Sequence, residues 1–124
     1  MSQTKIGAIE WFDLTVPDAQ GLSAFYAQVV GWQPQPVSMG DYDDYNMTQP
    51  DSGDTVTGVC HARGSNANLP AQWLMYARVA DVEASAQRCI ELGGEVLDGP
   101  RTMSGSNFCV IRDTAGAVLA LVSD

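Results

Sequence analysis

Hydrophobic and polar residues alternate along Ile9–Val16, and this period of two is the pattern of a β-strand with one buried face. One face of the predicted strand carries Trp11 and Asp13, and the other carries Phe12 and Leu14. The apolar face needs a covering layer, whereas the mixed face is able to meet a ligand or solvent.

A helix is predicted in the next segment and supplies that layer. Pro17 ends the strand because its ring removes a backbone donor, and the Asp18 carboxylate is a suitable cap for a first helical turn. Gly31 then ends the helix. The apolar residues of this helix recur at helical spacing, at Leu22, Phe25, Tyr26 and Val29. We expect this stripe to cover Phe12 and Leu14.

The same pattern occurs again after a shift of 63 positions, which is the separation of Asp18 and Asp81. The segment Gln72–Val79 alternates like the first strand, and the helix that Asp81 opens ends at Gly94, as the first ends at Gly31. Its apolar stripe consists of Val82, Ala86, Cys89 and Ile90. The sequence therefore predicts two copies of one strand–helix–strand–strand–strand unit.

These units predict an α+β fold with eight strands and two helices, in one domain of 124 residues. The first βαβββ module spans residues 5–63 and the second spans 71–124, joined by a linker at 64–70 that is rich in Gly, Asn and Ser. The turn signal Asp98-Gly99-Pro100 predicts a break after the strand that follows the second helix. Because each module is marginal in size, we expect the two to share one core.

The charge balance excludes two classes of partner. The chain carries 15 acidic and 6 basic residues, a net charge of −9, and contains no basic run. Such a protein repels the phosphates of nucleic acids and of anionic membranes. No apolar run approaches the ~20 residues of a membrane helix, so we expect a cytoplasmic protein.

The cysteine count does not indicate a disulfide framework. Cys60, Cys89 and Cys109 are odd in number, lack a CxxC spacing and lie in apolar segments. We expect small buried thiols in a reducing compartment. The alternative is a reactive Cys60 beside His61, the only histidine of the sequence.

Several short motifs occur in a characteristic order and spacing. They are Val16-Pro17-Asp18, Phe25-Tyr26, Val30-Gly31-Trp32, Gln72-Trp73-Leu74-Met75-Tyr76, Val79-Ala80-Asp81-Val82, Leu92-Gly93-Gly94 and Asp113-Thr114-Ala115-Gly116. With these motifs the chain resembles the vicinal oxygen chelate superfamily, which includes glyoxalase I, bleomycin-resistance proteins and extradiol dioxygenases. The resemblance implies paired modules that form a half-open barrel around a cavity, with one helix of each module outside. It also implies a homodimer.

The resemblance places metal ligands in the first and last strands of each module. Those positions are Trp11 and Leu74 in the first strands, and Thr57 and Ala120 in the last. Three of these side chains have no donor atom, and a lone hydroxyl is a poor ligand for a divalent ion. We therefore expect no metal and no other cofactor. A non-standard metal site at His61 is the alternative, although a lone histidine is more often a surface or hydrogen-bonded residue.

If these positions face a cavity as the resemblance implies, its predicted ligand-binding residues are Trp11, Asp13, Thr57, Leu74, Tyr76, Arg78 and Ala120. Trp11 offers a stacking surface, and Asp13 and Tyr76 are the candidate catalytic residues. Arg78 is placed to hold Asp13 or an anionic ligand. The alternative is that Asp13 only pairs with Arg78 or reaches solvent, and that Trp11 only fills space.

Two functions of different class remain open. The first is a metal-free protein that binds a small organic ligand in the cavity. The second is a metal-independent enzyme, an isomerase or lyase acting on a small carbonyl compound. A metal-dependent glyoxalase or dioxygenase is a third option, which the missing donor atoms disfavour.

Overall fold

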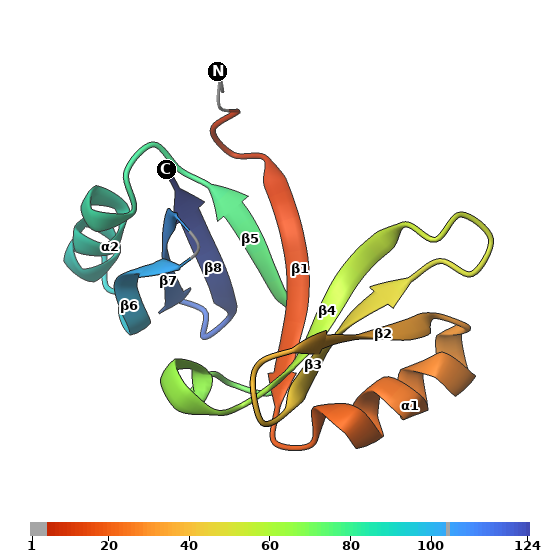
Figure 1. The fold of residues 1–124 in the computed structure, drawn as a ribbon. Coiled ribbons are helices and arrows are strands. Elements are labelled where there is room, and N and C mark those ends of the chain that lie inside the picture. Colours follow the sequence, from red (N-terminus) through yellow and green to blue (C-terminus); the bar gives the residue numbers. More distant parts are fainter. Residues whose placement is uncertain (1–4, 104) are drawn as a thin grey trace. The chain divides into compact units, whose positions relative to one another are not determined.

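The computed structural model describes residues 5–103 and 105–124. This part of the chain contains two α-helices, eight β-strands and one short 3-10 helix (Figure 1). In chain order the elements are β1 (Ile9–Val16), α1 (Ala19–Val30), β2 (Gln33–Ser38), β3 (Asp43–Thr48), β4 (Thr55–His61), η1 (Gly64–Asn66), β5 (Leu74–Arg78), α2 (Val82–Glu91), β6 (Glu95–Met103), β7 (Ser106–Arg112) and β8 (Val118–Ser123). The predicted α+β class and element order are confirmed.

Contacts divide the chain into two compact units. The first unit is Phe12–Trp73, and the second unit joins residues up to Trp11 with Leu74–Asp124. The first has the strand order β2-β3-β4-β1 and the second has the equivalent order β6-β7-β8-β5. In each unit the strand before the helix pairs in parallel with the last strand, and the other neighbours are antiparallel. The repeated βαβββ topology is therefore confirmed, while the module boundaries at residues 63 and 71 stay a prediction.

Helix α1 begins and ends where the sequence predicts. Asp18 Oδ1 accepts a hydrogen bond from Gly21 N at 2.9 Å, which satisfies a free amide of the first turn. Gly31 follows the last turn with φ 94°, a left-handed conformation that suits glycine, and its N–H donates to Ala27 O at 3.1 Å. Both ends of the helix are thus determined by local residues.

The core of the first unit lies between α1 and one face of the sheet. Its buried residues are Leu14, Val16, Ala19, Met47 and Val59, and Leu22 and Tyr26 of α1 pack against them. Phe25 and Val29 remain 54% and 63% exposed, and Phe12 remains 44% exposed. The prediction that the whole helical stripe covers Phe12 and Leu14 is therefore correct for Leu14 and wrong for Phe12.

The core of the second unit lies under α2. Its buried residues are Val82, Ala86, Cys109 and Leu121, with Ala77 of β5 and Val79, which follows β5, packed against them. Ile90, which was expected in the stripe, is exposed, and Cys89 is half-buried. Because side chains alternate along a strand, Leu74 and Tyr76 of β5 point to the face away from α2.

Strand β6 continues through the predicted break at Asp98-Gly99-Pro100. Its pairing with β7 shifts register between Val96 and Asp98 and again between Asp98 and Arg101, so irregular steps absorb the turn residues. Gly99 has φ 82°, which explains the glycine at this position. The prediction of a strand end at these residues is wrong.

Among the described residues, neither helix combines the length and the hydropathy that crossing a membrane requires.

Candidate functional site

An apolar pocket opens in the first unit. Its volume is about 230 Å³, and it is lined by Phe12, Trp32, Val56, Thr57 and Trp73. Four of these five side chains are aromatic or aliphatic, and the fifth contributes a methyl group beside its hydroxyl. We call this set the aromatic pocket. Its lining suits a flat apolar group far better than a charged one.

The two tryptophans of the aromatic pocket are held by Tyr26 of α1. The ring centroids of Trp32 and Trp73 lie 6.1 Å apart at 70°, and the Tyr26 ring lies 5.8 Å from Trp32 and 5.4 Å from Trp73. Trp73 Nε1 donates a hydrogen bond to the Tyr26 hydroxyl at 3.2 Å. The edge-to-face contacts and this hydrogen bond orient both indoles before any ligand arrives.

Thr57 brings the hydroxyl group to the lining of the aromatic pocket. Its Oγ1 donates to the Phe12 carbonyl oxygen at 2.6 Å, so the hydroxyl is already engaged. In the pairing of β1 with β4, Leu14 lies opposite Val59 and Asp13 lies opposite Gly58. Thr57 therefore shares the α1 side of the sheet with Val59, and the expectation that it lines one face with Asp13 is wrong. A ligand contact of Thr57 remains a prediction.

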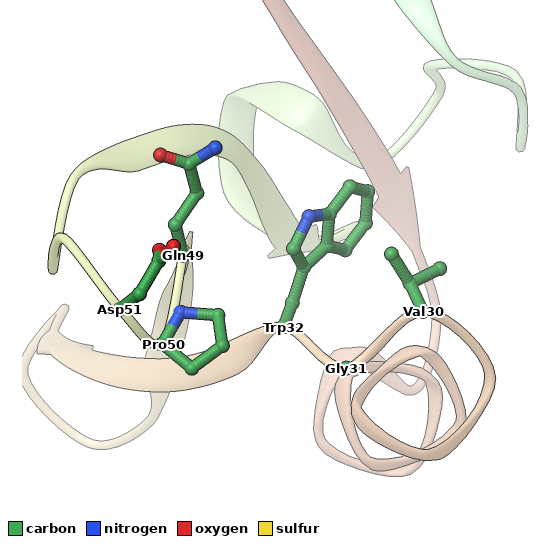
Figure 2. Close-up of a pocket in the computed structure, with 6 residues that line it drawn as sticks. All are labelled: Val30, Gly31, Trp32, Gln49, Pro50 and Asp51. Carbon is green, nitrogen blue, oxygen red and sulfur yellow. The ribbon is translucent and has the colours of Figure 1, made fainter.

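A second pocket of about 560 Å³ adjoins the first and shares Trp32 with it. Its other lining residues are Val30, Gly31, Gln49, Pro50 and Asp51. Figure 2 shows the Trp32 indole standing between the turn that carries residues 49–51 and the end of α1. We call this set the turn pocket. It has the carboxylate and amide groups that the aromatic pocket lacks.

In the second unit, three predicted ligand-binding residues lie on the face of the sheet away from α2. Tyr76 pairs with Ala120 across β5 and β8, and Leu74 shares their face by alternation. All three are buried, and the Tyr76 ring lies 6.3 Å from that of Phe108. Their orientation is the expected one, and their role in binding or catalysis stays a prediction.

Arg78 is engaged within the second unit. Its Nε and Nη2 donate to the two carboxylate oxygens of Glu10 at 2.8 Å each, and its Nη1 donates to Asp124 Oδ1 at 2.9 Å. The hydrogen bond from Arg78 lowers the pKa of Glu10, and the two carboxylates raise the pKa of Arg78. These contacts engage Arg78 with Glu10 and Asp124, and its pairing with the expected partner, Asp13, stays a prediction.

Trp11 and Asp13 fall on either side of the division between the two units, with Trp11 in the second and Asp13 in the first. Both side chains are half-buried. Trp11 was the expected stacking surface, but Trp32 and Trp73 form the aromatic pocket. The sequence signal for these two was their place at or near the start of a predicted strand, with Trp32 directly after Gly31 and Trp73 directly before Leu74.

The implied metal centre of the superfamily does not fit these residues. Trp11, Leu74 and Ala120 have no donor atom at the ligand positions, and the Thr57 hydroxyl bonds to the backbone. Among the described residues, no group of three or more His, Cys, Asp or Glu is placed to hold an ion. His61 Nδ1 lies 2.9 Å from Asp43 O, in the arrangement of a hydrogen-bonded histidine.

The half-buried Cys60 and the buried Cys109 are protonated thiols at neutral pH. Burial, followed by the charges of Asp13 and Asp44, raises the pKa of Cys60 to about 12. Burial is also the main cause that raises the pKa of Cys109 to about 11. Since the thiolate is the nucleophile, both side chains are poor nucleophiles, which disfavours the alternative of a reactive Cys60.

We predict that at pH 8 iodoacetamide alkylates Cys60 and Cys109 at least about tenfold more slowly than free cysteine, because few of their thiols are ionised. The Cys60 rate should rise steadily as the pH approaches 12, since its ionised fraction grows over that range. Peptide mass spectrometry after timed labelling measures each site separately. Alkylation of Cys60 at the free-cysteine rate at pH 8 would support the reactive alternative.

The chain is similar in sequence to known proteins and, separately, similar in fold to solved structures. The family model described as "Glyoxalase-like domain" matches residues 11–122. "Anthracycline biosynthesis protein DnrV" of Streptomyces peucetius is 30% identical over 134 aligned positions, which cover 98% of this chain and 48% of that protein. "Putative glyoxylase CFP32" of Mycobacterium tuberculosis is 26% identical over 117 positions, covering 94% and 44%. The chain thus spans about half the length of the curated relatives it matches.

Solved structures are similar in fold. A methylmalonyl-CoA epimerase in complex with methylmalonyl-CoA and NH4+ has a TM-score of 0.56 and 19% identity, with 97% of this chain and 96% of that chain covered. A glyoxalase/bleomycin resistance protein/dioxygenase superfamily member from Vibrio splendidus has a TM-score of 0.54 and 16% identity, with 94% and 100% covered. At these identities the similarity concerns the fold alone, and it confirms the predicted fold class.

Proposed function

The chain belongs to the glyoxalase-like domain family, and from this premise we propose that it binds a small molecule through a planar aromatic ring, without a metal ion. The observation that carries this proposal is the aromatic pocket, where Trp32 and Trp73 are oriented by Tyr26 around an apolar hollow. Aromatic side chains held in edge-to-face contact present a fixed surface to a flat ring.

The size of the aromatic pocket limits what it encloses. Pockets that enclose a drug-sized ligand usually measure about 300–1,000 Å³. The volume here is about 230 Å³, which suits one ring system of a larger molecule or a small aromatic compound. The rest of a larger ligand must therefore lie outside this pocket, and the turn pocket, which shares Trp32 with it, offers space for that part.

The name of one relative supports an aromatic ligand. The Streptomyces peucetius relative is named for anthracycline biosynthesis, and anthracyclines contain planar fused rings. Trp11, Leu74 and Ala120 lack a donor atom for a metal ion, and this supports binding without a metal. The catalytic roles of Asp13 and Tyr76, the homodimer and the cytoplasmic location stay predictions, and the enzyme alternative gains no specific support from the geometry.

We predict that titration with naphthalen-2-ylmethanol shifts the indole N–H signals of Trp32 and Trp73 in a 1H–15N NMR spectrum, because its ring stacks in the aromatic pocket. The three tryptophans give three such signals, and that of Trp11 serves as the internal control. We expect saturable binding at about millimolar concentration for so small a ligand, unchanged by EDTA. The probe should be recovered chemically unchanged.

Two results would contradict this proposal. A shift of the Trp11 signal alone would move the site to the residue expected from the sequence. Binding that EDTA abolishes and that returns with a divalent metal would show a metal-dependent site.

Conversion of a small carbonyl compound by the purified protein would instead support the enzyme alternative, and loss of that conversion in Asp13→Asn would assign Asp13 to it.

A further inference from the structure

The side chains that line the turn pocket are more polar than those that line the aromatic pocket. It shares Trp32 with the aromatic pocket, and its opposite sides are the end of α1 and the turn that joins β3 to β4 (Figure 2). The Gln49 side chain brings an amide and the Asp51 side chain brings a carboxylate, whereas no basic side chain lines it. A hollow that combines an indole with a carboxylate suits a cation, because both attract positive charge.

The end of α1 adds to this negative character. The carbonyl groups of a last helical turn carry a partial negative charge, which basic residues commonly offset. The last turn of α1 contains no basic residue. Val30 and Gly31, which line the turn pocket, stand at this uncompensated end. The helix therefore favours a positive charge at the same place as Asp51.

The turn between β3 and β4 has a defined shape. Gln49 N donates to Asp54 O at 2.8 Å, and Gly53 N donates to Gln49 O at 2.8 Å. The Ser52 hydroxyl donates to Gln49 Oε1 at 2.9 Å. These bonds close the turn without using the Asp51 carboxylate, which stays available for a ligand.

The arginines of the chain do not neutralise Asp51. Each of the five forms an ion pair with a carboxylate elsewhere, as the pairs Arg63–Asp41, Arg78–Glu10, Arg88–Glu91, Arg101–Asp98 and Arg112–Glu95 show. Within the part of the chain that the structure describes, no hydrogen bond or ion pair engages the Asp51 side chain. A ligand that carries its own cation would supply the missing charge.

We propose that the turn pocket binds an ammonium group of the ligand, with Asp51, the Trp32 ring and the end of α1 as its partners. This inference rests on the proposed function, since the ring of the same molecule occupies the aromatic pocket, which shares Trp32 with the turn pocket. It narrows the ligand to an aromatic compound with a short cationic substituent. Asp51 then favours ligands with a positive charge, and Trp32 favours ligands with an aromatic ring, so the preferred ligand carries both.

The test compares two probes that share the naphthalene ring and differ in the substituent, the neutral naphthalen-2-ylmethanol and the cationic (naphthalen-2-ylmethyl)trimethylammonium. The unmodified protein should bind the cationic probe more tightly, and Asp51→Asn should weaken that binding by about two- to fivefold, the effect of one partly exposed charge pair. The neutral probe should bind Asp51→Asn as it binds the unmodified protein. The preference should also decline as salt is raised.

Asp54→Asn is the matched control, because it removes the same charge from the same turn without lining the pocket. Equal weakening by Asp51→Asn and Asp54→Asn would assign the preference to the net charge of −9 and overturn the inference. Equal affinity of the unmodified protein for both probes would also overturn it, while leaving the aromatic pocket supported. Failure of both probes to bind would overturn the proposed function as well.

Discussion

Replacing Trp73 with alanine is expected to weaken the binding of naphthalen-2-ylmethanol by about tenfold or more. Removal of one aromatic stacking partner commonly costs about 1–3 kcal/mol of binding free energy. Trp73 is also in edge-to-face contact with Trp32 and Tyr26, so its loss releases the orientation of the remaining rings. NMR titration of the unmodified and Trp73→Ala proteins under the same conditions measures the change in affinity.

Two further variants separate stacking from folding. Trp73→Phe keeps an aromatic ring and loses the hydrogen bond from Nε1 to Tyr26 Oη, so we expect a smaller loss of affinity than with alanine. Thermal unfolding of each variant should show that it is folded at the titration temperature. If Trp11→Ala caused the large loss and Trp73→Ala did not, the ligand would lie where the sequence alone predicted it.

Replacing Gly99 with alanine is expected to lower the free energy of unfolding by about 2–5 kcal/mol. Gly99 has φ 82°, and the left-handed region costs a residue with a Cβ about 1–2 kcal/mol. The new Cβ would also meet Phe108 O at 2.8 Å, Arg101 N at 3.1 Å and Cys109 Cα at 3.2 Å. These are backbone atoms of β6 and β7, so relief requires the strands to move apart. Urea unfolding followed by circular dichroism measures the loss.

Gly116→Ala is the control for the backbone conformation alone. Gly116 has φ 90°, similar to that of Gly99, but a Cβ added there has no neighbour within 4 Å. We expect this variant to lose only about 1–2 kcal/mol. Equal losses for the two variants would show that crowding between β6 and β7 contributes nothing at Gly99.

Local sequence signals predicted the elements well because they depend on neighbouring residues. Asp18 and Asp81 cap helices that begin next to them, and Gly31 ends α1 through its own conformation. The repeat after 63 positions predicted that both units have one topology, since equal patterns of strands and helices pack alike. The exception was Asp98-Gly99-Pro100, where pairing with β7 keeps the chain extended despite its turn residues.

The candidate site depended on the tertiary structure. Alternation along one strand separates Asp13 from Leu14, but it does not show which face a residue of another strand joins. The register of β1 with β4 decided that Thr57 lies on the side of Leu14 and Val59.

Side-chain packing decided the rest. Trp32 and Trp73 are 41 residues apart in the sequence, the difference between their numbers, and neither has a local pattern that marks a pocket. They meet because both pack against Tyr26 of α1. The sequence by itself determined the repeated fold and the lack of metal donors, because these follow from residue types and near neighbours. Only the tertiary structure decided which aromatic residues form the pocket, because that depends on contacts between distant segments.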